Sequence, residues 1–410
     1  MFLVFHDANA QMEARFDGFA NMTLTYSDDK NYGFRSSILN KGRTRLSLAP
    51  DSLLGLQTGI SFNSKLDLFG QVIVQDRINY ETSQFVESLF LRYRLNRNIN
   101  FKLGRFSTNP YLFTDSRYVG YSYNWIRTPY EMYSTAGAAG NTNGLEFNYI
   151  KNLSIGRLRT TLAYGDINFD DEKSKKIKIE YENFRSISLE LSDINWRVQL
   201  THAGADLNEL WFEGVDQVRN LDLALPPQLS AVVPFVNQLQ EGLIGDDISY
   251  RYTSLGVSYN FDYFDVIAEY ALYESNWLTA QDSTYGYVSF AKNFGNTALH
   301  LTYGRVAPKD LRTAIDLNAA AESLPQPLLQ VLGGISAPFD TNIQEQSPDQ
   351  QSISLGFRWD FKTNWALKFQ FDHNVIESPS HGLFLVSPDI DPSVLDGRVN
   401  VLSLGLTVTF

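Results

Sequence analysis

Four histidines beyond the first ten residues could take part in acid–base chemistry, and they are scattered along the chain: His202, His300, His373 and His381. Nucleophilic hydrolases need such a histidine beside an activated serine or cysteine. The 410-residue sequence has no cysteine, no G-x-S-x-G segment and no H-E-x-x-H segment. We therefore expect neither an enzyme nor a bound cofactor or metal, because the usual signatures of both are missing.

A second set of chemically active groups consists of charged side chains that fall on every second position. Glu13, Arg15 and Asp17 alternate with Ala14 and Phe16. Successive side chains of a β-strand point to opposite faces, so this segment has one charged face and one apolar face. Charges gathered on a wetted face act on dissolved ions and polar solutes through their electric field, without any catalytic geometry.

The alternation recurs along the whole chain in about sixteen segments of roughly ten residues, which is typical of a membrane β-barrel. Short turns separate the segments at one end, near residues 63–65, 96–98, 193–195, 262–263, 293–296 and 362–364. Much longer connections occur at the other end, at 104–142, 203–247 and 306–350. The sequence therefore predicts an all-β fold, a transmembrane antiparallel β-barrel with short periplasmic turns and long external loops.

Composition indicates that strands, and not helices, would cross the membrane. No stretch approaches the roughly 20 apolar residues of a membrane helix, and the mean hydropathy is only −0.23. Aromatic residues gather at the expected turns, as at Trp359, Phe361 and Trp365. Such clusters are typical of the aromatic girdles of membrane barrels, although aromatic residues packed around the hairpins of a soluble protein are an alternative. The net charge of −12, without a basic patch, argues against nucleic-acid binding.

The C-terminal segment NVLSLGLTVTF completes the pattern, with apolar side chains on every second position from Leu402 to Phe410. This amphipathic segment ending in phenylalanine resembles the assembly signal of Gram-negative outer-membrane porins. The segment KLGRFSTNPYLFTDSRYVGYSYNWIRTPYEMYSTAG, residues 102–137, resembles the third-loop region of the porin superfamily that includes the phosphate- and pyrophosphate-selective porins. The resemblance implies a sixteen-stranded barrel in the bacterial outer membrane, usually a homotrimer, whose third loop folds inward and narrows the pore. It also implies contact with membrane lipid and lipopolysaccharide, and recognition of Phe410 by the barrel-assembly machinery.

Strand periodicity and the resemblance together single out three groups of candidate pore residues. The third loop would supply the constriction: Arg105, Asp115, Arg117, Tyr118, Arg127 and Glu131. Alternation predicts a basic wall on the inner face: Arg92, Arg94, Arg157, Arg159 and Arg197. Asp265 and Glu269 would oppose it from a later wall. The resulting transverse field would orient polar solutes, although the same charges could be solvated lumen residues that confer no selectivity.

These groups predict passive diffusion of small hydrophilic solutes or ions through a water-filled pore. Phosphate-selective porins line the pore with a continuous basic ladder, whereas acidic residues are interspersed here: Asp17, Glu180, Glu182 and Glu190. We therefore expect weak selectivity or a mild preference for anions. Two alternatives stay open from the sequence, namely a substrate-specific channel gated by the long loops and a structural or adhesin-type barrel.

The long loops 203–247 and 306–350 show helix-like apolar spacing interrupted by prolines. They could fold over the mouth and filter solutes, or pack on one another and on lipopolysaccharide. Near the N-terminus, Ala8-Asn9-Ala10 follows a short apolar run and matches an A-x-A cleavage site. We therefore assign residues 1–10 to the remnant of a signal peptide and residues 11–410 to one barrel domain, the alternative being an ordinary apolar start.

Overall fold

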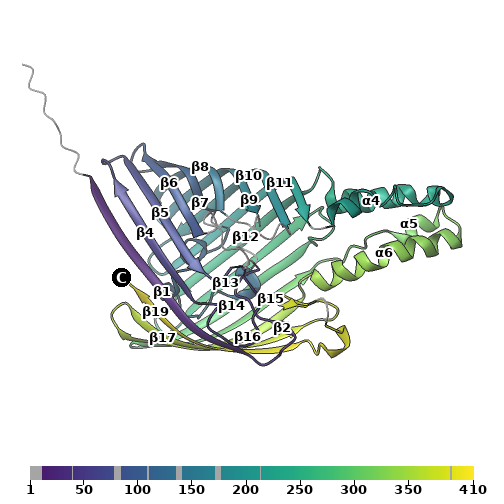
Figure 1. Ribbon diagram of the computed structural model, residues 1–410. Coiled ribbons are helices and arrows are strands. Elements are labelled where there is room, and N and C mark those ends of the chain that lie inside the picture. The colour runs from purple at the N-terminus through teal and green to yellow at the C-terminus, as the bar shows by residue number, and fades with distance from the viewer. Residues whose placement is uncertain are drawn as a thin grey trace, which may run out of the picture.

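The computed structural model describes residues 12–38, 40–77, 85–108, 110–134, 141–170, 177–212, 214–387 and 390–410. The predicted signal-peptide remnant, residues 1–10, lies outside these described residues. Within them, one continuous antiparallel sheet rolls into a barrel (Figure 1). Among the described residues, no helix combines the length and the apolar character that crossing a membrane would require.

In the described part of the chain, sixteen long strands build the barrel wall. They are β1 (Glu13–Ser27), β4 (Leu53–Ser61), β5 (Leu66–Gln75), β6 (Val86–Arg94), β7 (Ile99–Ser107), β8 (Asn141–Leu153), β9 (Gly156–Asp170), β10 (Ile177–Ser192), β11 (Trp196–Phe212), β12 (Ser249–Asn260), β13 (Asp265–Ser275), β14 (Ser283–Phe294), β15 (Thr297–Pro308), β16 (Gln350–Lys362), β17 (Trp365–Ile376) and β19 (Arg398–Thr409). The short strand β3 (Arg45–Ser47) continues the line of β4 along β1, because it pairs with residues 25–27 of β1 while β4 pairs with residues 13–21.

The first and last strands close the barrel. β1 pairs antiparallel with β19 over nine positions, from Phe19 opposite Thr409 to Ser27 opposite Val401. Two further backbone hydrogen bonds join Gly18 and Phe410, at 2.7 and 2.9 Å. A closed sheet leaves no unpaired strand edge, which is the condition for strands in hydrocarbon. The predicted sixteen-stranded antiparallel barrel is therefore confirmed.

The alternation of side chains separates an apolar outer face from a polar inner face. On β19, Ser403 is 1% exposed, whereas its neighbours Leu402 and Leu404 are 39% and 48% exposed. The same exposed apolar face continues on other strands: Leu54, Leu56, Val72, Val74, Leu255, Val257, Leu299 and Leu301. A charge on a lipid-facing position at mid-depth costs about 2–4 kcal/mol. This cost fixes the register, because a shift by one residue would exchange the two faces.

One end of the barrel has short turns with a repeated local chemistry. The side-chain oxygen of Asn63 accepts hydrogen bonds from the backbone N–H groups of Lys65 and Leu66, at 2.9 and 3.0 Å. In the next turn at this end, the side-chain oxygen of Asn96 accepts equivalent hydrogen bonds from the N–H groups of Asn98 and Ile99, at 2.8 and 2.9 Å. This side-chain-to-backbone turn explains the asparagines predicted to mark hairpins. Exposed aromatic rings cluster at another turn, where Phe261 stacks on Phe264 with centroids 4.5 Å apart.

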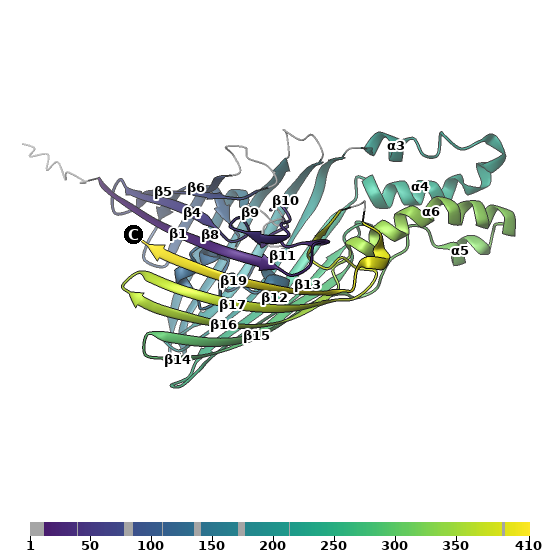
Figure 2. The same ribbon diagram turned by 60° about the horizontal axis from the view of Figure 1, so that its bottom comes forward.

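Helices occupy the two longest external loops. The fifth loop contains α3 (Val215–Arg219), η3 (Pro227–Val232) and α4 (Val233–Ile244), and the seventh contains α5 (Leu317–Ala321) and α6 (Gln326–Gln346). The helices share a small apolar core whose fully buried members include Val236, Leu239, Leu332 and Ile343. We call this unit the helical extension. Figures 1 and 2 show it extending away from the strand ends, so the two loops pack on one another and do not lie across the barrel opening.

The other connections at this end of the barrel contain only short elements. β2 (Tyr32–Gly33) in the first loop pairs with β18 (Leu385–Val386) in the last loop, and η4 (Pro392–Val394) follows in that last loop. The third loop, residues 108–140, contains η1 (Thr114–Ser116), η2 (Gly120–Ser122) and α2 (Tyr130–Tyr133). Its described part, residues 110–134 with Thr108, is the segment that positions the candidate site.

Candidate functional site

The third loop lies inside the barrel. Its short helical elements contact β13, β14, β15, β16 and β19, and Figure 1 shows them within the outline of the sheet. Three buried charged side chains attach it to the wall and to the first loop: Arg127, Lys368 and Glu269. We call them the loop-three anchors. The inward-folded third loop expected from the sequence is thus present.

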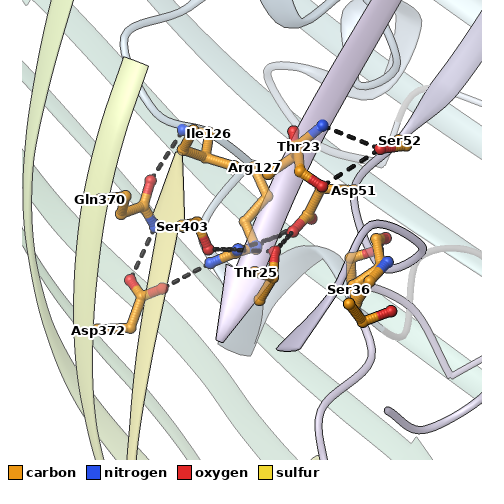
Figure 3. A network of polar contacts seen from close by, with 12 residues as sticks. Thr23, Thr25, Ser36, Asp51, Ser52, Ile126, Arg127, Gln370, Asp372 and Ser403 are labelled. Carbon is orange, nitrogen blue, oxygen red and sulfur yellow. Dashed lines mark hydrogen bonds and ion pairs between the residues drawn. The ribbon is translucent and has the colours of Figure 1, made fainter. Parts of the chain in front are cut away.

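Arg127 is the centre of a buried polar network between loop three, the first loop and the wall (Figure 3). Its Nε and Nη2 donate to the two carboxylate oxygens of Asp51, at 2.9 and 2.7 Å. Its Nη1 donates to Asp372 of β17 at 2.5 Å, and Nη2 also donates to Ser403 of β19 at 2.5 Å. The Arg127 side chain is only 7% exposed. Removing one partner of a buried ion pair typically costs about 3–5 kcal/mol, so this network fixes the loop strongly.

Lys368 of β17 forms the second anchor. Here a side chain of the wall donates the hydrogen bonds and backbone carbonyl groups of loop three accept them. It is 2% exposed. Its Nζ donates to three loop-three carbonyl oxygens, those of Gly120, Tyr123 and Trp125, at 2.5, 2.6 and 2.6 Å. An ammonium group has three donors, and all three are satisfied here. Beside it, Nη1 of Arg358 donates to the carbonyl oxygens of Tyr121 and Tyr123, each at 2.9 Å.

Glu269 of β13 forms the third anchor at the start of the loop. Its carboxylate accepts hydrogen bonds from the backbone N–H of Leu112 at 2.8 Å and from the hydroxyls of Tyr133 and Tyr287 at 2.5 and 2.7 Å. Arg197 of β11 donates to the carbonyl oxygen of Leu112 at 2.7 Å. The backbone N–H and C=O groups of Leu112 are therefore both hydrogen-bonded to the wall, to β13 and to β11.

Aromatic packing supplements the polar anchors. The indole of Trp125 packs edge-on against Tyr287, with centroids 6.0 Å apart. Its Nε1 donates to Thr302 at 2.9 Å and to Ser289 at 3.2 Å. Further buried tyrosines of the wall and loop belong to the same cluster: Tyr111, Tyr123, Tyr130, Tyr252 and Tyr285. A buried tyrosine or tryptophan combines a large apolar surface with one hydrogen-bonding group, which suits a loop packed on a polar wall.

Two wall glycines provide the space that the loop occupies. A Cβ atom on Gly304 of β15 would overlap the carboxylate of Glu131, and one on Gly256 of β12 would lie 2.6 Å from Cγ of Leu112. Both contacts are closer than side chains tolerate. The wall and the loop are therefore complementary in shape at these points.

The predicted constriction residues take several different positions. Arg127 and Glu131 are buried in the contact between loop and wall, and burial raises the pKa of the Glu131 carboxyl against hydrogen bonds from Ser352 and Gln350. Arg117 is paired with Glu87 of β6 at 2.8 Å. The remaining three are separated: Asp115 is exposed, the carbonyl oxygen of Tyr118 accepts from Asn21 at 3.3 Å, and Arg105 stands in β7 opposite the outward-facing Leu89. Although its backbone has outward parity, the Arg105 charge lies within interaction range of Glu87, the partner of Arg117.

The predicted basic wall is spread over β6, β9 and β11, and part of its charge is compensated. Arg92 and Arg94 share Asp67, at 2.9 and 2.6 Å. Arg159 stands opposite Glu190 in the β9–β10 register, and Arg157 stands opposite Ser192. Arg197 lies 3.9 Å from Glu190.

The two predicted opposing acids behave differently from one another. Asp265 is partly exposed and accepts a hydrogen bond from Asn293 at 3.0 Å, whereas Glu269 is covered by loop three. Sequence reasoning missed that Glu269 and Lys368 hold the loop, although alternation places both on the inner face. A charged inward position next to wall glycines and tyrosines is the signal that could have indicated a covered site. Among the described residues, no group of three acidic or histidine side chains could hold a metal ion.

The barrel resembles solved bacterial outer-membrane proteins. OmpT of Vibrio cholerae is 12% identical over 97% of this chain and 98% of its own, with a TM-score of 0.54. An anion-selective porin from Comamonas acidovorans is 12% identical over 98% of this chain and 100% of its own, with a TM-score of 0.54. Salmonella typhi OmpF, solved in complex with daunomycin, is 12% identical over 97% of this chain and 97% of its own, with a TM-score of 0.53. At these identities the similarity shows the fold. No protein-family model and no curated protein matches the sequence.

Proposed function

We propose that this protein is an outer-membrane porin that allows passive diffusion of small hydrophilic solutes or ions through a water-filled pore narrowed by loop three. The observation that carries the proposal is a closed barrel, apolar outside and polar inside, with an internal loop held by three buried charged anchors. A barrel that served only as a scaffold would not need a polar inner face with a loop fixed against it. The shared fold of the anion-selective porin and OmpF supports the same conclusion.

The pathway that we propose runs between loop three and the wall formed by β5–β11. The anchors draw the loop toward β12–β19 and the first loop, while the Arg117–Glu87 pair also joins it to β6 at the end opposite the short turns. On the short-turn half of β5–β11, alternation gives the inner face six basic side chains, Arg92, Arg94, Lys102, Arg157, Arg159 and Arg197, and three acidic ones, Asp67, Glu146 and Glu190. Mixed walls with a small excess of one sign select weakly, so we expect a mild preference for anions.

Assembly and location follow from the same proposal. The exposed apolar face would contact outer-membrane lipid, and the helical extension would lie outside among lipopolysaccharide. The barrel-assembly machinery would recognise Phe410. The Phe410 ring covers Gly18 on the outer face of the β1–β19 pair. A homotrimer and kinship with the phosphate- and pyrophosphate-selective porins belong to this proposal as well, on the resemblance of residues 102–137.

Planar-bilayer recording tests the channel. Purified protein should insert in discrete conductance steps, and a trimer should close in three equal steps. In a potassium chloride gradient, the reversal potential should show a small preference for chloride. Absence of conductance would defeat the porin proposal, and a strong preference for potassium would defeat the basic-wall explanation of selectivity.

A further inference from the structure

A cavity of about 380 Å³ lies between loop three and the short-turn ends of β11–β15. Its size is within the range of small-molecule sites, about 300–1,000 Å³. Loop three contributes Phe113 and Asn124, and the strands contribute Arg197, Asn260, Asp265 and His300. We propose that this cavity is a binding site for a neutral, hydroxyl-rich solute such as a mono- or disaccharide. The inference rests on the proposed channel function, because the cavity would bind solutes at one end of the pore.

The polar groups of the lining suit hydroxyl groups. Three asparagines border the cavity: Asn124, Asn260 and Asn293. An amide offers both donors and acceptors, and a sugar hydroxyl both donates and accepts, so each amide can pair with one or two adjacent hydroxyls. The serine hydroxyls of Ser122, Ser258 and Ser289 add further groups of the same kind.

His300 is the clearest sign that a polar partner belongs here. It borders the cavity, is 2% exposed, and neither ring nitrogen has a hydrogen-bond partner within the described part of the chain. Buried polar atoms are nearly always paired in native proteins. Both ring nitrogens are covered in this structure and Nε2 packs against Gly356, so a ligand hydroxyl would complete the hydrogen bonding of this imidazole once the ring turns toward the cavity.

Aromatic rings give the cavity an apolar side. Phe113 is partly exposed and packs at 87° against Trp125, with centroids 5.4 Å apart. Because the indole nitrogen of Trp125 is fixed by Thr302 and Ser289, this wall is rigid. The C–H face of a pyranose ring is apolar while its edge carries hydroxyls, so an aromatic wall beside amides matches both surfaces of a sugar.

The charges of the lining favour a neutral ligand over an ion. Arg197 and Asp265 have opposite signs and stand two strands apart, on β11 and β13. Each already has a partner, since Arg197 donates to the carbonyl oxygen of Leu112 and Asp265 accepts from Asn293. An anion would be attracted by one and repelled by the other. A neutral solute avoids this conflict.

Saturation-transfer NMR on the full-length protein in detergent tests the site, with maltose as the probe and sulfate as the competing anion. The wild type should transfer saturation to the pyranose protons, and sulfate should not compete. The double variant N124A/N260A should weaken maltose binding about tenfold, the effect of losing one or two neutral hydrogen bonds. H300L should also weaken it. The control N152A removes an inward asparagine at the short-turn end of β8, away from the cavity, and should bind as the wild type does.

The outcomes separate this inference from the channel itself. No transfer in the wild type, equal losses in N152A and N124A/N260A, or displacement of maltose by sulfate would overturn the sugar site. Because binding in detergent does not require conduction, a protein that conducts potassium chloride but ignores maltose would refute only the cavity. A protein that binds maltose but never conducts would refute the channel and leave the site standing.

Discussion

Loop three and the helical extension are both long insertions into the same barrel, yet they are held by opposite physical means. Loop three is fixed by buried ion pairs and charge-assisted hydrogen bonds to strands, through Arg127, Lys368 and Glu269. The helical extension is held by its own apolar core around Leu239 and Leu332.

The difference follows from what each loop has beside it. The inner wall of a porin-like barrel is polar, so a loop inside can be attached only by satisfying buried polar groups. Outside the barrel there is no wall to bind, and helices that project from it must bury apolar surface against one another. Charge therefore fixes the inner loop, and the hydrophobic effect stabilises the outer unit.

Replacing Arg127 by alanine should give the largest effect on this comparison. The change leaves Asp51 and Asp372 buried without their partner, which should cost about 3–5 kcal/mol and release loop three. Thermal unfolding in detergent should occur at a lower temperature, and channel recordings should become noisy. The matched control is R219A in α3, whose exposed pair with Asp216 at 3.3 Å should be worth less than about 1 kcal/mol. Equal effects of the two changes would contradict the anchoring role.

Replacing Leu239 by alanine should damage the outer unit alone. Truncation of a fully buried leucine typically lowers the free energy of unfolding by about 2–5 kcal/mol. Here the loss should affect only the helical extension. Limited proteolysis should cut between residues 214 and 247 more rapidly, while the melting temperature of the barrel and the conductance stay unchanged. A fall in barrel stability would show that the two regions are coupled.

Adding one methyl group at Gly304 should disturb the fit between wall and loop. G304A forces the side chain of Glu131 to move, and overpacking of this kind costs about 1–3 kcal/mol. G59A is the control, since a Cβ on this inward glycine of β4 meets nothing within 4 Å. Urea unfolding in detergent should separate the two variants, and it would count against the fit if they behaved alike.

The smallest effect concerns the protonation of Glu131. Burial raises the pKa of this carboxyl in the folded protein, so its contribution to stability is present below the unfolded pKa of about 4.3 and is lost as the pH rises through the folded pKa. E131Q removes this dependence and keeps a side chain that can bond with Gln350. It should unfold at a higher temperature than the wild type at neutral pH and at the same temperature near pH 4. A constant difference at both pH values would contradict the assignment.

The wall of the barrel could be predicted from the sequence because side chains along each strand must alternate between the lipid-facing and the inner face. Leu404 and Ser403 fall on the predicted faces, since a polar group in lipid is costly at every strand. The short turns were predictable for a similar local reason, the asparagines that bond their own backbone. Loop three was placed inside by resemblance alone.

The candidate site was less predictable because it depends on contacts between distant segments. Alternation gives the face of Lys368 but not that three carbonyl oxygens of loop three surround it. In the same way Glu269 has inward parity, yet only the folded loop shows that it is covered. Arg105 has the opposite parity to the inward residues of β7, because it pairs with Leu89, and inclusion in the third-loop segment obscured this.

Cysteine modification during bilayer recording tests the central claim, that neighbouring strand positions face water and lipid in turn around a conducting lumen. The chain has no cysteine, so R159C and L404C each carry one reactive site. A negatively charged methanethiosulfonate reagent should lower the single-channel conductance of R159C and leave L404C unchanged. The same response in both variants, or no response in R159C, would contradict the claim.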